Sequence, residues 1–131
     1  MAARVFLALS ALVWLPYGLW CFFAPGFLAG AAGVSFLSPT GTTELRAMYG
    51  GLQAALGALA LAGALREPLR RSALIALGSL TSGLGLARLL GALLDGEVSS
   101  YTAMGLGFEW TSAALCAVFL ARAASANEKL A

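Results

Sequence analysis

Two ionisable residues lie well inside apolar stretches of the chain: Arg88, within LTSGLGLARLLGALL, and Glu109, within YTAMGLGFEWTSAALCAVFLA. A charge in the hydrocarbon core of a bilayer is costly, so such residues face protein or water and mark a functional site or a structural ion pair. Both roles are open here. The two residues could pair and lock two helices together. Alternatively, Arg88 could hold an anionic or carbonyl-bearing ligand while Glu109 orients the arginine or carries a proton.

The composition predicts a membrane protein. Of the 131 residues, 60% are hydrophobic and 11% are charged, which is unlike a soluble domain of this length. Four apolar segments are long enough to cross a bilayer, and the first is longer than the apolar core of a signal peptide. We therefore expect an all-α fold, a four-transmembrane-helix bundle that forms a single membrane domain over residues 1–131. The expected helices comprise residues 5–24, 43–65, 72–94 and 102–122.

The distribution of basic residues predicts the topology. Lys and Arg occur at the amino end, between the second and third apolar segments, and at the carboxyl end, but not in the other two connections. Because basic residues favour the cytoplasmic side, we expect both termini and a tail of residues 123–131 in the cytoplasm. No basic patch is interleaved with aromatic residues, so nucleic acid is not an expected partner. The basic residues in question are Arg4, Arg66, Arg70, Arg71, Arg122 and Lys129.

The connection at residues 25–42 is long, apolar and uncharged, and this topology places it on the outer face. Its large apolar residues and interspersed glycines predict a short interfacial or re-entrant segment. Pro39 and Gly41 are expected to break any helix before the next span, and Thr42 or Thr43 to cap that span. The segment could be an ordinary interfacial loop or a lid over a pocket.

Polar residues recur at similar depth in all four segments. At 1.5 Å per residue, Arg88 lies about 9 Å and Glu109 about 10 Å from the outer ends of their helices. Helical spacing puts one polar or small-residue stripe on each helix, and lipid cannot satisfy such a stripe, so it should face the bundle interior. We expect a ligand-binding layer in the outer half of the bundle. Its predicted residues are Trp14, Tyr17, Arg46, Tyr49, Gln53, Arg88 and Glu109.

The remaining polar residues and the cysteines indicate helix ends and no further chemical site. Glu44 is expected in the first turn of the second helix, where the helix dipole favours an anion, and Asp95 with Gly96 is expected to form a helix end and turn. The chain has no histidine, and its only cysteines, Cys21 and Cys116, differ in depth by about 20 Å, too far for a disulfide. No metal site, cofactor or catalytic residue is predicted, because neither metal-ligand nor nucleotide motifs occur.

Several motifs together resemble a known family. They are TELRAMYGG at residues 43–51, RLLG at residues 88–91 followed by Asp95-Gly96, and Glu109 in the last span. This pattern resembles bacterial proteins grouped as domain of unknown function 4345. The resemblance covers nearly the whole chain and implies a four-helix protein of the bacterial inner membrane, more distantly similar to DoxX-type proteins, with no established activity. The positions that match the family's charged pattern are Glu44, Arg46, Arg88 and Glu109, with Tyr49 beside them.

The leading functional hypothesis is a binding module for a lipid, quinone or sterol-like amphiphile. Arg46 and Arg88 would bind its polar head, the aromatic residues of the polar layer would pack its body, and residues 25–42 would close the pocket. The alternatives are an accessory subunit that assembles a membrane complex, a small proton-coupled transporter that uses Glu109, and an enzyme acting on a lipid. Expected partners are therefore membrane lipids, a small amphiphilic ligand, and either a second copy of the chain or another membrane protein.

Overall fold

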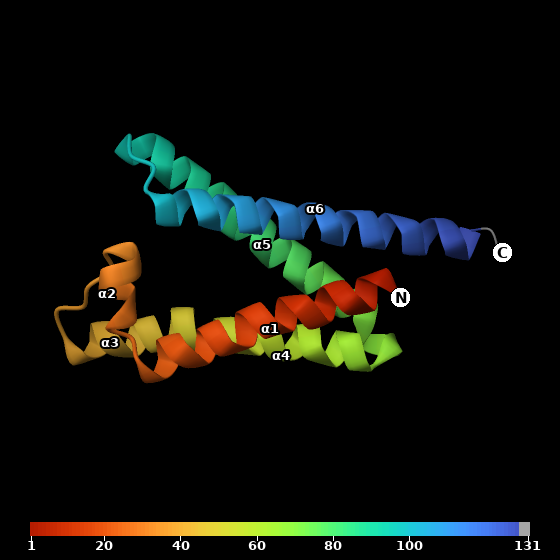
Figure 1. The fold of residues 1–131 in the computed structure, drawn as a ribbon, viewed down its shortest axis with the longest axis horizontal. Coiled ribbons are helices and arrows are strands. Elements are labelled where there is room, and N and C mark those ends of the chain that lie inside the picture. The colour runs from red at the N-terminus through yellow and green to blue at the C-terminus, as the bar shows by residue number, and fades with distance from the viewer. Residues whose placement is uncertain (129–131) are drawn as a thin grey trace. The chain divides into compact units, whose positions relative to one another are not determined.

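The computed structural model describes residues 1–128, and within this range the chain is helical, with short connections and no strand (Figure 1). Four stretches are long and apolar enough to cross a membrane, as predicted: Ala2–Phe23, Pro39–Leu65, Glu67–Asp95 and Ser100–Ser125. The elements are α1 (Ala2–Phe23), α2 (Phe27–Ala32), α3 (Pro39–Leu45), the π-helix η1 (Arg46–Gly51), α4 (Leu52–Leu65), α5 (Glu67–Asp95) and α6 (Ser100–Glu128).

The chain divides into two compact units, with the boundary between Arg70 and Arg71 near the start of α5. The first unit contains α1 to α4 and the first residues of α5. The second contains the remainder of α5 together with α6. That the spans close into one four-helix bundle stays a prediction.

In the first unit, α1 and α4 run antiparallel in direct contact (Figure 1). Glycines make the contact close. A β-carbon on Gly18 would overlap the backbone of Ala54, and a β-carbon on Gly57 would overlap the backbone of Leu15. Because small residues let two helix backbones approach, this packing is backbone against backbone.

The second span starts a full turn earlier than predicted, at Pro39. Ser38 is the N-cap, and its Oγ accepts a hydrogen bond from the Gly41 amide at 3.1 Å. Proline suits the first helical position, where the missing N–H would have had no partner. The prediction that Pro39 and Gly41 break the helix and that Thr42 or Thr43 caps it was therefore wrong. The hydroxyls of Thr42 and Thr43 donate instead to the carbonyls of Ser38 and Pro39, at 3.2 and 3.1 Å.

The connection before this span contains the short helix α2. Gly33 ends α2 in the left-handed conformation, with φ +68°, and its amide donates to the Leu28 carbonyl. The Val34 amide donates to the same carbonyl at 3.2 Å, and the Leu28 side chain is fully buried. The two hydrogen bonds to the Leu28 carbonyl and the buried Leu28 side chain hold this part of the connection in place, and no charged residue takes part. Its position relative to the membrane stays a prediction.

In the second unit, α5 and α6 form an antiparallel helical hairpin. Asp95 is the last residue of α5 and Gly96 follows with φ +68°, which confirms the predicted helix end and turn. Ser99 precedes α6, and its Oγ accepts a hydrogen bond from the Thr102 amide at 3.1 Å, the arrangement of an N-cap. The hairpin is therefore closed by a short turn whose Ser99 side chain satisfies one of the first backbone donors of α6.

Helix α6 runs to Glu128, so the first part of the predicted tail, residues 123–128, is helical. Lys129 and the remainder of that tail lie outside the described residues. Along the hairpin, a β-carbon on Gly78 would lie 2.9 Å from Cβ of Cys116, which marks a close crossing of α5 and α6. Both Cys116 and Cys21 are buried free thiols.

Candidate functional site

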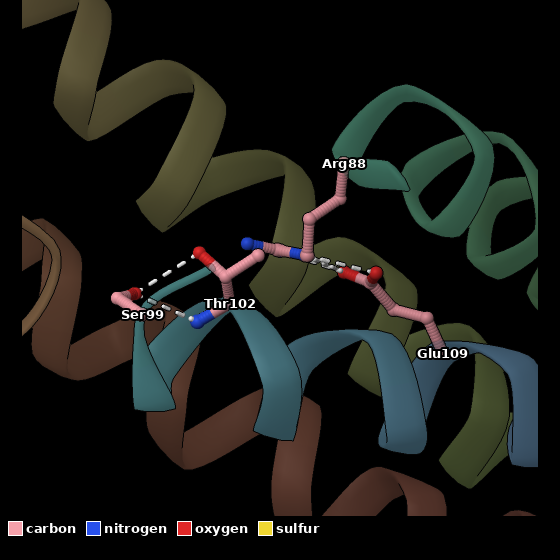
Figure 2. Close-up of polar contacts among 4 residues, drawn as sticks. All are labelled: Arg88, Ser99, Thr102 and Glu109. Atoms are coloured by element: carbon pink, nitrogen blue, oxygen red, sulfur yellow. Dashed lines mark hydrogen bonds and ion pairs between the residues drawn. The ribbon is translucent and has the colours of Figure 1, made fainter. Parts of the chain in front are cut away.

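Arg88 and Glu109 pair directly and join α5 to α6. Arg88 Nε donates to both carboxylate oxygens of Glu109, at 3.1 and 3.0 Å, and Nη2 donates to Oε1 at 2.7 Å. Figure 2 shows the arginine side chain reaching from α5 toward the carboxylate on α6. The Glu109 side chain is only 4% exposed, and that of Arg88 is 27% exposed. The predicted facing of these two residues is thus realised as a buried ion pair.

Neighbouring residues on α6 make room for the arginine. A β-carbon on Gly105 would lie 2.7 Å from Nε of Arg88 and 2.9 Å from Cζ, so a larger residue there would displace the guanidinium. The centroid of the Tyr101 ring lies 5.7 Å from Cζ of Arg88, within cation–π range. Sequence reasoning did not assign Tyr101 or Gly105 to the site. The available signal was spacing, because residues 101, 105 and 109 repeat every four positions on one helical face.

This geometry favours a structural role for the pair. Three charge-assisted contacts bind both oxygens of Glu109 and the Nε and Nη2 nitrogens of Arg88. The opposite charges therefore compensate each other away from water. In a low-dielectric environment, removal of one partner would leave an uncompensated buried charge. Of the two roles that the sequence left open, the lock between two helices fits the contacts better than a ligand-holding arginine.

Arg46 lies at the start of η1 and reaches the end of α1. Its Nε donates to the backbone carbonyl of Phe22 at 3.1 Å. The last carbonyls of a helix have no intrahelical donor and carry partial negative charge, so the guanidinium both satisfies and neutralises this end of α1. Within residues 1–128 the two Nη groups of Arg46 make no hydrogen bond or ion pair. Their donors remain available.

A surface groove of about 580 Å³ adjoins this arginine. Its apolar lining residues include Phe36 and the fully exposed Leu37. Hydroxyl groups and the guanidinium supply its polar part. We call it the Arg46 groove. The lining residues are Phe36, Leu37, Ser38, Pro39, Thr42, Thr43 and Arg46.

The π-helix η1 spans RAMYGG and follows α3 without a break in helical backbone angles. A π-helix holds one extra residue per turn and often occurs at functional sites. Here it carries Arg46 at its start and Gly50 near its end. A β-carbon on Gly50 would lie 2.8 Å from Cβ of Phe22, the residue whose carbonyl binds Arg46. The π-helix therefore contacts the end of α1 twice, through Arg46 and through Gly50.

None of the other predicted site residues is among those that line the Arg46 groove. Trp14 is buried on α1, and Tyr17, Tyr49 and Gln53 are half-buried. All four belong to the first unit, as does Arg46, whereas the ion pair belongs to the second. The convergence of the whole set in one layer stays a prediction.

Glu44 does not have the predicted capping position. Because the helix starts at Pro39, its first turn contains no acidic residue, and Glu44 is exposed near the end of α3. The helix-dipole argument required the later start and fails with it. Over the part of the chain that the structure describes, no group of three or more His, Cys, Asp or Glu side chains could hold a metal ion.

Comparison with known families gives one match. The profile of the family described as Domain of unknown function (DUF4345) matches residues 2–120. The chain belongs to this family. The matched range includes the Arg46 groove, the π-helix and the Arg88–Glu109 pair, and it confirms the resemblance seen in the motifs. No curated protein and no solved structure shows a significant match to the chain.

Proposed function

We propose that this protein binds the polar head of an amphiphilic molecule in the Arg46 groove. The observation that supports the proposal is the state of Arg46. Its Nε is held by the Phe22 carbonyl, which fixes the side chain, while its Nη donors have no acceptor within residues 1–128. A fixed guanidinium in a groove with apolar lining residues suits an anionic or carbonyl-bearing head with a hydrocarbon body.

The groove chemistry agrees with a lipid-like ligand. The guanidinium can donate two parallel hydrogen bonds to a carboxylate or phosphate. Thr42 and Thr43 add hydroxyl groups, and Phe36 and Leu37 add apolar surface. The volume of about 580 Å³ lies in the range of small-molecule sites, about 300–1,000 Å³. A lipid headgroup, a quinone ring or a sterol-like head would fit this description.

The charges in the connections between helices are the basis for proposing where the protein lies in the cell. We infer a multi-pass protein of the bacterial inner membrane with both termini in the cytoplasm, because the basic residues gather in the connections that this topology puts inside. Residues 36–46 then lie at the outer face. In this scheme Arg88 and Glu109 stabilise the fold and do not touch the ligand. A proton-coupled role for Glu109 would first require its three contacts with Arg88 to break.

Native mass spectrometry of the detergent-purified protein tests the proposal. We expect wild type to retain a discrete small molecule, Arg46→Ala to lose it, and Arg66→Ala to keep it, because Arg66 is an exposed arginine outside the groove. Thermal unfolding of each variant shows whether it is folded. Equal retention with and without Arg46→Ala, compared in folded proteins that also carry Arg4→Gln and Arg70→Gln so that the basic groove at the other end of α1 is disabled, would refute the site. Loss in a folded Arg88→Ala variant with retention in Arg46→Ala would move the ligand to the ion pair.

A further inference from the structure

A second groove, of about 460 Å³, lies at the opposite end of α1 from Arg46. The four lining residues at the start of the chain have the spacing i, i+3, i+4 and i+7, so they share one helical face. Arg70, on the first turns of α5, completes the lining. The whole groove belongs to the first unit. Its lining residues are Met1, Arg4, Val5, Ala8 and Arg70.

Arg70 lines this groove and also has one buried, unsatisfied donor. Its Nε is buried and has no hydrogen-bond partner within residues 1–128. Its only ion pair there is a long one, 3.7 Å from Nη1 to Glu67, whose side chain is 86% exposed. A buried donor without an acceptor costs about 1–3 kcal/mol, so a ligand oxygen that reaches Nε after a movement of the arginine side chain would stabilise the protein.

The positive charge around the groove favours an anionic ligand. Arg4 and Arg70 line it, and Arg66 and Arg71 lie close by in the chain, against the single exposed acid Glu67. Arginine forks match the geometry of phosphate oxygens. The rest of the lining is apolar, which suits hydrocarbon. Free phosphate would leave this apolar surface uncovered, whereas a phospholipid would cover it.

We propose that this groove binds an anionic phospholipid, with its phosphate between Arg4 and Arg70 and an acyl chain along Met1, Val5 and Ala8. The loop charges put this end of α1 at the cytoplasmic leaflet, where anionic lipids attract basic residues next to transmembrane helices. The site is separate from the Arg46 groove. It stands on its own lining residues and on the unsatisfied Nε of Arg70.

Lipid titration followed by native mass spectrometry tests this assignment. The probes are phosphatidylglycerol, phosphatidylcholine and soluble glycerol phosphate, and the variants are Arg4→Gln, Arg70→Gln and their combination. Arg71→Gln is the matched control, because it removes the same charge from the next position of α5, and that position does not line the groove. Arg46→Ala separates this site from the Arg46 groove.

We expect phosphatidylglycerol to bind more tightly than phosphatidylcholine, and each groove variant to weaken its binding about tenfold, the loss of one hydrogen bond to a charged group. Arg71→Gln and Arg46→Ala should bind it as wild type does. Equal losses in Arg4→Gln and Arg71→Gln would reduce the site to diffuse charge and overturn the proposal. Displacement of the lipid by glycerol phosphate would also overturn it, because the apolar lining would then contribute nothing. If Arg70→Gln does not fold, Arg4→Gln decides, since Arg4 is exposed.

Discussion

The two helix pairs of this protein are held together in different ways. In the first unit, α1 and α4 meet backbone to backbone at Gly18 and Gly57. In the second, α5 and α6 are joined by the buried pair of Arg88 and Glu109. Lipid tails are as apolar as leucine, so the hydrophobic effect does not drive helices together within the bilayer. Helices can still be held together by close van der Waals packing or by polar contacts between them. The first unit uses close packing, and the second uses a polar contact.

This difference predicts that the two units respond differently to added bulk and to removed charge. Glycine packing has no room for even one methyl group, but it does not depend on charge. The ion pair depends on both charges together, and an apolar pair of similar volume could replace it. Substitutions that add bulk and substitutions that remove charge should therefore affect the two units in different ways.

The largest effect is expected from breaking the ion pair. Glu109→Leu leaves Arg88 uncompensated and should lower the free energy of unfolding by about 3–5 kcal/mol. The double variant Arg88→Met/Glu109→Leu removes both charges and should recover most of that loss. Denaturation with sodium dodecyl sulfate in mixed micelles measures both. If the double variant is as unstable as the single one, the pair contributes more than mutual compensation.

The next effect is expected at the glycine contact. Gly57→Ala places a methyl group into the backbone of Leu15 and should cost about 1–3 kcal/mol, the usual range for overpacking. The matched control is Gly83→Ala, because nothing lies within 4 Å of its added β-carbon. That control should gain about 0.5–1 kcal/mol from helix propensity. Equal shifts in the midpoint of the same denaturation curve would show that α1 and α4 do not need a close approach at Gly57.

A smaller effect is expected at Gly105, where glycine serves the charged pair. Gly105→Ala would displace the flexible Arg88 side chain and not a backbone, so we expect a loss of about 1 kcal/mol. The double-mutant cycle with Arg88→Met identifies the cause. The alanine should cost almost nothing once the arginine is gone. A cost that persists in the Arg88→Met background would instead indicate a backbone clash.

The smallest effect is expected at the start of α6. Ser99→Ala removes the side chain that accepts from the Thr102 amide and should cost about 1 kcal/mol or less. Ser99→Asp keeps an acceptor and serves as the control. Hydrogen exchange of the first amides of α6 reports the change directly, and unchanged protection in Ser99→Ala would show that the hydroxyl does not cap the helix.

The sequence predicted those features that depend on local composition. The number of helices that are long and apolar enough to cross a membrane follows from apolar length, and the facing of Arg88 and Glu109 follows from their matched depth in neighbouring segments. The first property depends on one helix alone, and the second depends on one hairpin alone. They needed no knowledge of how helices distant in the chain approach one another.

The features that the sequence did not predict depend on tertiary contact. The π-helix at Arg46–Gly51 forms where Gly50 packs on Phe22, a contact between separate spans. The same approach brings Arg46 to the Phe22 carbonyl. Periodicity puts Gly105 on the same face of α6 as Glu109, but its close contact with the Arg88 side chain also depends on the offset between α5 and α6. The early helix start at Pro39 was available from the chain, because Ser followed by Pro is a strong N-terminal signal.

The short turn between α5 and α6 has a consequence for how the chain enters the membrane. Only residues 96–99 separate the two helices, so Arg88 and Glu109 are made close together in time and can pair early. A lone arginine within a span raises the cost of insertion, by about 2.5–3.5 kcal/mol at the helix centre on translocon scales and by less toward a helix end, where Arg88 lies. We expect α5 and α6 to leave the translocon together, as a hairpin whose charges are already neutralised.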